Sequence, residues 1–392
     1  MLLNLLWLLL PVAYLAGWWS GRKGAGLAPA CKVRRRPSDA RSYVRGLNYL
    51  ISEQQDKAID LFVGIDRLDQ EMVETQLALG NLFRNRGQFD HAIRIHENLV
   101  TRAAAHSDAH ADALLELAAD YSASGLFDRA EEIYGDLLNN KRHADTARDA
   151  LIGIFEREKD WPRAIRLAEE QQRSGEHYRQ IQLGHYYCEL AEQAVRNDER
   201  ETARLYLKKA LAEHPASARA NILRANLAMG RGDYSRAIEC YTAVEKANPD
   251  LAPEIISPLL EAFERAGDTR ALKAYIRHVR SRNNAYSVIR VTQQAIRRID
   301  GDAAADRFFK EQILKRPSLK GLRDWAQSEL DKNKRGEKDK FAVIINMLDS
   351  VVEDKPAYVC SACGFEARSL HWQCPSCGTW DSVRTFIGAE GE

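Results

Sequence analysis

The chain has 392 residues, of which 29% are charged and 45% are hydrophobic, and its formal net charge is +1. This length allows two or more domains or one extended array, and this composition excludes a polytopic membrane protein. Residues 1–37 hold six basic residues and no acidic one, so the rest of the chain carries a net charge of about −5. Such a body is a poor electrostatic partner for nucleic acid, and seven cysteines do not suggest a disulfide-stapled secreted protein.

The first 21 residues contain no charged side chain and predict a transmembrane anchor. About twenty helical residues, at a rise of about 1.5 Å each, span the ~30 Å hydrocarbon core of a bilayer. Trp18 and Trp19 fall where an interfacial aromatic belt lies, and Arg22 begins a basic juxtamembrane linker over residues 22–40. Basic residues on this flank predict that the body of the protein lies on the cytoplasmic side.

A cleaved signal peptide is the alternative interpretation of this start, because Ala28-Pro-Ala before Cys31 resembles a cleavage site. Two features argue against cleavage: the apolar stretch has no positive residue before it, and Arg22 and Lys23 separate it from that site. We therefore expect a retained, single-pass anchor. Cys31 is also a candidate for lipidation, although a lone juxtamembrane cysteine is usually a free thiol.

Residues 41–317 repeat with a period close to 34, counted at the small residue that starts the second helix of each unit. This period is typical of tetratricopeptide repeats, which are antiparallel helix pairs stacked into a superhelix with a long concave binding surface. Pro215, Pro249 and Pro317 lie twelve positions past their anchors and are expected to end second helices. The anchor residues are Ala58, Ala92, Ala130, Ala164, Ala203, Ala237, Leu272 and Ala305.

Glycines mark the turns inside several repeats. Gly87, Gly125 and Gly232 suit the left-handed position that ends a helix, and an Asp or Ser shortly after each can cap the next helix. The fourth repeat lacks this glycine, and there we expect Asp160 or a neighbour to cap the second helix. Residues 318–355 predict one further helix pair, joined by a charged, solvated loop.

The tail, residues 356–388, holds two Cys-x-x-Cys pairs that are each followed by glycine and are separated by ten residues. Cys360, Cys363, Cys374 and Cys377 can place four thiolates around one zinc or iron ion, and the glycines allow backbone amides to point at the sulfurs. About thirty residues cannot fold on an apolar core alone, so the metal must supply much of the folding free energy. Two disulfides or a redox-active dithiol are the alternatives, and a reducing compartment favours the metal.

No enzyme motif is present, since the chain lacks a Gly-rich phosphate loop, Gly-x-Ser-x-Gly and His-Glu-x-x-His. We therefore predict that the protein is not an enzyme and has no catalytic residues. Trp372 and Trp380 flank the second cysteine pair and are expected to shield the metal and to dock the tail on the last repeat. Packing roles, not metal binding or catalysis, are expected for His185, His371, Cys188 and Cys240.

The order of these parts resembles the lipopolysaccharide assembly protein B family of Gram-negative bacteria over essentially the whole chain. That resemblance implies an all-α tetratricopeptide solenoid behind a transmembrane helix, with a rubredoxin-like or zinc-ribbon-type module at the C-terminus. It points to iron, although a spacing far tighter than in true rubredoxins leaves zinc open. The strings that carry it are the leucine-rich start with Arg22-Lys23, residues 54–62, 79–84, 92–96 and 185–190, and the cysteine tail 358–377.

The resemblance further implies an inner-membrane adaptor that regulates the amount of lipopolysaccharide. Such a protein presents the deacetylase that commits lipid A synthesis to the membrane AAA protease FtsH, and an inner-membrane lipopolysaccharide sensor restrains it. It also gathers other lipopolysaccharide assembly proteins, and a homo-oligomer is compatible with this role. Two alternatives stay open: a redox protein with an iron–tetrathiolate centre, and a generic membrane-tethered co-chaperone.

Overall fold

The computed structural model describes residues 70–173, 180–281, 285–332, 338–352 and 356–386, together with 55–64 and five isolated positions between 45 and 52. The predicted anchor and linker, residues 1–40, lie outside these described residues. Within the described part of the chain, no helix combines the length and the apolar composition needed to cross a membrane. The chain divides into two compact units, Met1–Ala147 and Arg148–Glu392.

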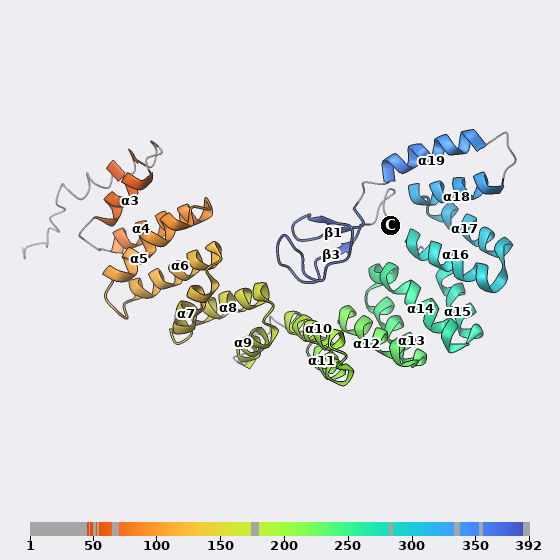
Figure 1. Ribbon diagram of the computed structural model, residues 1–392, viewed down its shortest axis with the longest axis horizontal. Helices are drawn as coiled ribbons and strands as arrows, with labels where there is room; N and C mark the ends of the chain where they lie inside the picture. The colour runs from red at the N-terminus through yellow and green to blue at the C-terminus, as the bar shows by residue number, and fades with distance from the viewer. Residues whose placement is uncertain are drawn as a thin grey trace, which may run out of the picture. The chain divides into compact units, whose positions relative to one another are not determined.

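Helices alternate through the first unit as the repeat period predicts (Figure 1). The anchors Ala58, Ala92 and Ala130 have no exposed surface, because a methyl group is what allows the paired helix to pack closely. A side chain at Gly80 would clash with the imidazole of His96, which explains the glycine there. The helices are α3 (Gln55–Val63), α4 (Gln70–Asn85), α5 (Phe89–Arg102), α6 (Asp108–Ser124) and α7 (Phe127–Leu137).

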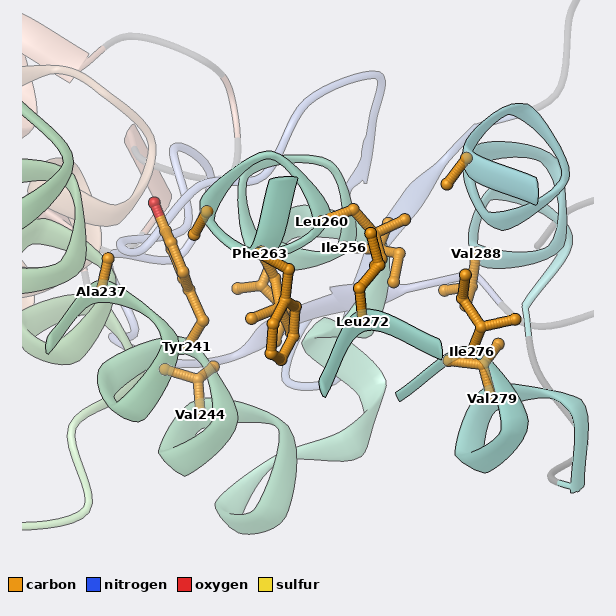
Figure 2. Close-up of a cluster of buried hydrophobic side chains, with 14 of the residues drawn as sticks. Ala237, Tyr241, Val244, Ile256, Leu260, Phe263, Leu272, Ile276, Val279 and Val288 are labelled. Carbon is orange, nitrogen blue, oxygen red and sulfur yellow. The ribbon is translucent and has the colours of Figure 1, made fainter. Parts of the chain in front are cut away.

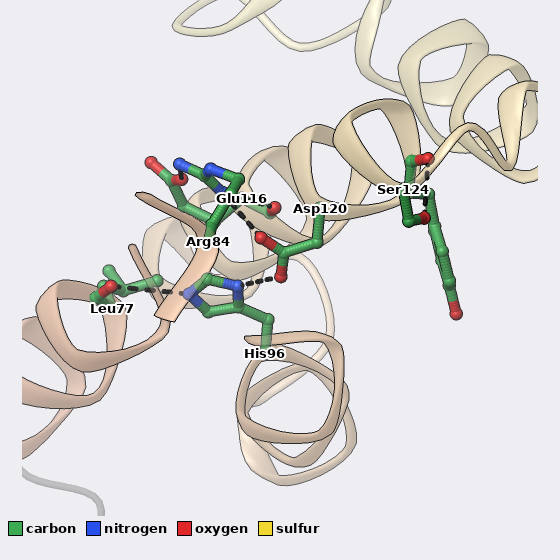
Figure 3. Close-up of polar contacts among 7 residues, drawn as sticks. Leu77, Arg84, His96, Glu116, Asp120 and Ser124 are labelled. Carbon is green, nitrogen blue, oxygen red and sulfur yellow. Dashed lines mark hydrogen bonds and ion pairs between the residues drawn. The ribbon is translucent and has the colours of Figure 1, made fainter. Parts of the chain in front are cut away.

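A buried polar network joins three helices of this first unit (Figure 3). His96 of α5 and Asp120 of α6 are fully buried, and His96 Nδ1 lies 2.5 Å from Asp120 Oδ2. Arg84 of α4 donates to the other oxygen of Asp120 at 2.8 Å and to Glu116 at 2.6 Å. The carboxylate of Asp120 therefore accepts hydrogen bonds on both oxygens, as a buried charge requires.

The second unit continues the same pairing, and its central core is apolar. Tyr241, Phe263 and Leu272 come from three successive helices and pack side by side in Figure 2. The two anchors that depart most from the repeat pattern, Leu272 and Ala305, are also buried. The helices are α8 (Ala144–Glu158), α9 (Trp161–Arg173), α10 (Gln180–Arg196), α11 (Arg200–Glu213), α12 (Ala218–Arg231), α13 (Tyr234–Ala247), η2 (Pro249–Leu251), α14 (Ala252–Ala266), α15 (Thr269–Ser281), α16 (Tyr286–Asp300), α17 (Asp302–Lys315), α18 (Leu319–Lys332) and α19 (Lys338–Val352).

The helix ends agree with the sequence pattern in part. Gly87, Gly125 and Gly232 all have positive φ, and Lys159 takes the same conformation where the fourth repeat lacks glycine. Asp233 and Asp160 cap α13 and α9, but α5 and α7 begin without a side-chain cap. The acidic residues expected to cap those two helices, Asp90 and Asp128, lie within the first helical turn and not at the cap position. There their negative charge interacts favourably with the helix dipole.

Within the described residues, strands occur only at the C-terminus. The repeat array is therefore all-α, as predicted, whereas the tail contains a small β-sheet. β1 (Tyr358–Cys360) lies in the middle of an antiparallel sheet between β2 (Glu366–Ala367) and β3 (Val383–Thr385). A sheet with strands of two or three residues cannot stabilise itself, because independent stability needs a hydrophobic face or other packing. The stability of this module must therefore come from its cysteines and from the surface on which it docks.

Candidate metal centre

Each cysteine pair forms a tight knuckle with the same backbone geometry. The amide of Gly364 donates to the carbonyl of Cys360 at 2.9 Å, and the amide of Gly378 donates to the carbonyl of Cys374 at 2.9 Å. Both glycines have positive φ, at 77° and 72°. The glycines thus serve the turn as predicted, although their own amides bond to carbonyl oxygens and not to the sulfurs.

The two knuckles bring all four sulfur atoms together, with every Sγ within 4.8 Å of the others. Cys360 Sγ lies 3.8 Å from Cys377 Sγ, and Cys363 Sγ lies 3.7 Å from Cys374 Sγ. A metal bound tetrahedrally with bonds of about 2.3 Å to sulfur would separate its ligands by about 3.8 Å. The residues therefore fit a tetrathiolate site, and their sulfurs are too far apart for the ~2.05 Å bond of a disulfide.

Nearby hydroxyl groups and backbone amides favour thiolates at two of the cysteines. The hydroxyl of Ser382, 3.3 Å from Cys360 Sγ, lowers the pKa of that thiol to about 6, assisted by backbone amides of the knuckle. The hydroxyl and then the amide of Thr379 lower the pKa of Cys377. At Cys363 a backbone hydrogen bond from Phe365 lowers the pKa, but burial and the other three cysteines outweigh it and raise that pKa to about 11, so metal binding still has to remove a proton from this ligand.

Trp380 docks this module on the repeats of the second unit. Its indole N–H donates to Glu156 of α8 at 3.0 Å, and its ring stacks on His185 of α10 with centroids 4.6 Å apart. The rings of Trp161 and Tyr186 make edge contacts that complete an aromatic cage around it. Most of these partners belong to α8 and α10, which are first helices of their pairs.

Polar contacts extend this interface on both sides of Trp380. His185 Nε2 lies 3.0 Å from Asp381 Oδ2, and the Thr385 hydroxyl donates to the carbonyl of Asp250 at 2.9 Å. The Tyr358 hydroxyl donates to the carboxylate of Glu254 in α14. The expectation that the module docks on the last repeat is therefore wrong: it packs on α8, α10 and α14, whose side chains supply hydrogen-bonding partners.

The other residues singled out in the sequence take different places. Cys188 and Cys240 are buried, and burial raises the pKa of Cys188 to about 12, so both are inert packing residues as predicted. The cluster of possible metal ligands consists of the four cysteines and does not include His371. His185 is buried and also stacks on Trp380 of the module, a contact that its sequence neighbours Tyr186 and Tyr187 did not reveal.

Fold and site together define a class: a tetratricopeptide-repeat protein that carries a C-terminal tetrathiolate module. A family model described as a rubredoxin metal binding domain matches residues 358–385, and two tetratricopeptide-repeat models match residues 77–106 and 194–256. The chain is also 33% identical over 391 residues to lipopolysaccharide assembly protein B of Escherichia coli K12, with all of both chains covered. It therefore belongs to the lipopolysaccharide assembly protein B family.

Two further comparisons agree with this assignment. The Haemophilus influenzae protein of the same name is 32% identical over 405 residues, covering 99% of this chain and all of the relative. Among solved structures, Naa15/Naa10 bound to HypK-THB matches 80% of this chain and 50% of its own with a TM-score of 0.50 at 15% identity. At that identity the last comparison supports the helical-repeat fold alone.

Proposed function

We propose that this protein is an adaptor of lipopolysaccharide assembly that presents the lipid A deacetylase to the membrane protease FtsH. The observation that carries the proposal is the full-length likeness to lipopolysaccharide assembly protein B of E. coli. The likeness extends to both ends of the chain. It includes the N-terminal residues expected to form an anchor and the cysteines of the tail. The protein would regulate synthesis by choosing which enzyme is degraded, and would perform no chemistry itself.

The architecture suits an adaptor better than a catalyst. Stacked helix pairs offer extended surfaces for protein segments. A site that already has four cysteine ligands leaves no open position for a substrate or an activated water, unlike catalytic zinc sites with three protein ligands. In this proposal the metal, iron or zinc, holds the module in shape, and the module fixes the repeats around α8, α10 and α14.

Tethering at the inner membrane is part of the same proposal. An anchor over residues 1–21 would keep the body on the cytoplasmic side and near a membrane-bound protease. A short flexible tether raises the effective concentration of two partners to about millimolar, so weak contacts with the repeats suffice. A membrane-embedded lipopolysaccharide sensor and other assembly proteins would meet the adaptor in the same plane, as single copies or as a homo-oligomer.

A redox role is the second candidate, and one observation favours it. Cys363 and Cys377 are exposed, so a bound iron would have a path to an electron-transfer partner through two surface sulfurs. A reversible iron potential in the protein purified from its own cells would support that role. Zinc in the site would exclude it, because zinc has no accessible second oxidation state.

Depletion of the protein tests the adaptor proposal directly. We expect the half-life of the lipid A deacetylase to lengthen and lipopolysaccharide to accumulate, and we expect the effect to disappear in cells whose FtsH is inactive. A co-chaperone of general function would instead change the half-lives of many membrane proteins together. An unchanged deacetylase half-life after depletion would show that this protein does not act as the adaptor.

A further inference from the structure

A groove with a volume of about 590 Å³ lies on the second unit between α15, α16 and α17, away from the residues that hold the metal module. Its floor is apolar and is formed by Ile276, Ile296 and Phe308. Its rim is basic, because α15 contributes Arg270, Lys273, Arg277 and Arg280 and carries no carboxylate of its own. Asp300 is the one acidic residue among those that line the groove.

Two of the four rim cations have partners and two do not. Lys273 Nζ lies 2.8 Å from Asp300 Oδ1, and Arg280 Nε donates to Glu311 at 2.9 Å. Arg270 and Arg277 are exposed and make no ion pair or side-chain hydrogen bond with any residue in the described part of the chain. The groove therefore has two uncompensated positive charges on α15.

The spacing of these two arginines selects the kind of ligand. They are seven positions apart on one helix face, which corresponds to about 10.5 Å along the axis. A single phosphate or carboxylate would have to draw both side chains together along the helix, whereas two carboxylates seven residues apart on a helix match the spacing directly. A bilayer surface is flat, and a concave apolar floor between cations instead fits an apolar side chain flanked by acidic ones.

We propose that this groove binds an acidic, amphipathic segment of a partner protein. Two of its carboxylates pair with Arg270 and Arg277, whose guanidinium groups bind carboxylates through paired hydrogen bonds. An apolar residue between those carboxylates packs over Ile276. The metal module occupies the surface around α8, α10 and α14, so this groove offers the second unit a separate place to hold a protein.

An internal comparison supports the assignment. A smaller groove of about 380 Å³ lies between α11, α12 and α13, and Arg204 and Lys208 stand at the same positions after their anchor as Lys273 and Arg277 do after theirs. Arg204 has an acidic neighbour there in Glu201, with 3.6 Å between the charged groups. The pattern therefore recurs along the array, and the groove on α15 has the larger volume of the two.

This inference deepens the proposed adaptor function and rests on it only in taking the ligand to be a protein. The test uses the full chain in neutral phosphatidylcholine nanodiscs and a labelled helical peptide in which two glutamates seven residues apart flank leucines. Fluorescence anisotropy should show binding that weakens as salt is added. The double variant Arg270→Gln, Arg277→Gln should weaken it by roughly tenfold or more, because two charge-assisted contacts are lost.

Matched controls make the result specific. The double variant Arg204→Gln, Lys208→Gln removes the same amount of charge from the smaller groove and should change binding by less than about threefold. The double variant Arg270→Lys, Arg277→Lys keeps the charge of the larger groove and should retain most of the affinity. All of these variants should match the wild type in circular dichroism.

Three outcomes would overturn the proposal: no binding of the glutamate peptide, equal losses from both double glutamine variants, or binding of phosphatidylglycerol vesicles that depends on the two arginines while the peptide does not bind. None of these outcomes touches the adaptor function, which the half-life of the deacetylase tests separately.

Discussion

His185 and Trp380 stack with their ring centroids 4.6 Å apart and their planes inclined by 19°, and this contact joins a repeat helix to the metal module. The same indole donates to Glu156, which also accepts a hydrogen bond from Tyr186 at 2.6 Å. One tryptophan thus contacts both α8 and α10, so the module fixes the position of one repeat against the next. The metal site and the packing of these two repeats are connected through this residue.

Trp380→Ala should release the module from the repeats without removing its metal. We expect a loss of about 2–3 kcal/mol in docking free energy, less than for a fully buried tryptophan because Trp380 is only partly buried. Hydrogen exchange should speed up in β3 and in α10, while metal content stays at the wild-type value. Trp380→Phe keeps an aromatic ring and should show a smaller change; unchanged exchange in the alanine variant would contradict the docking role.

The parts of the structure that could be predicted are those with local signals. Buried anchors such as Ala92 and Ala203 repeat at intervals of 33 to 39 residues, and each cysteine pair needs only a tight turn to bring its two sulfurs together. The docking site could not be predicted, because Trp380 and Glu156 are 224 residues apart and no periodic pattern links them. Their pairing depends on the curvature of the second unit, which arises from small rotations summed over several repeats.

Asp120→Ala should strongly destabilise the first unit. The substitution leaves the buried His96 without its carboxylate partner and removes one of the two carboxylates that Arg84 contacts, and breaking a buried pair costs about 3–5 kcal/mol. Hydrogen exchange in α4, α5 and α6 measures the effect locally. The control is Asp60→Ala, which breaks an exposed pair with Arg94 and should cost less than about 1 kcal/mol. Equal effects from the two substitutions would show that the buried network contributes little.

Asp160 should make the stability of the second unit depend on pH. Burial raises its pKa, but hydrogen bonds from the side chain and backbone of Arg163 outweigh burial and lower it below the ordinary value. A carboxyl whose pKa is lower in the folded state stabilises the fold above its unfolded pKa, and this contribution is lost as the pH falls through the folded value. Acidification below about pH 4 should therefore remove the capping contribution.

Asp160→Ala should cost about 1 kcal/mol near neutral pH, the usual value of a helix cap, and much less at low pH, about pH 3. Denaturant unfolding of the wild type and of Asp160→Ala at the two pH values gives the difference in free energy of unfolding. Any loss of metal at low pH affects both proteins equally. Asp128→Ala is the control, since Asp128 lies in the first turn of α7, where no side chain caps the helix. A difference that stays constant with pH would exclude the charged cap.

The anchor should remain on the mature protein. Residues 1–21 lack charged side chains, and the basic residues that follow should hold the body on the cytoplasmic side. Intact-mass spectrometry of protein purified from membranes should show residues 1–30 present, and a chain that starts at Cys31 would refute the assignment. Deleting residues 1–21 should leave the repeats folded but impair function, because the partners proposed here are membrane-bound.

Replacing one metal ligand should empty the site and unfold the module while the repeats persist. Cys360→Ser or Cys377→Ser exchanges a thiolate for a mostly protonated hydroxyl, and a structural tetrathiolate site does not tolerate a missing ligand. Binding free energies of structural zinc in small peptides are about 10–16 kcal/mol, so the metal-free module should be largely unfolded. The helices should remain, since each repeat is stabilised by its neighbours.

Elemental analysis should therefore find one metal per wild-type chain and almost none in either serine variant, while helical circular dichroism changes little. Cys188→Ala is the matched control, because Cys188 is buried in α10 and is not one of the four clustered cysteines. It should keep its metal. Full control of the deacetylase by a metal-free variant would show that the module is dispensable, and a wild-type chain without metal would rule out the site itself.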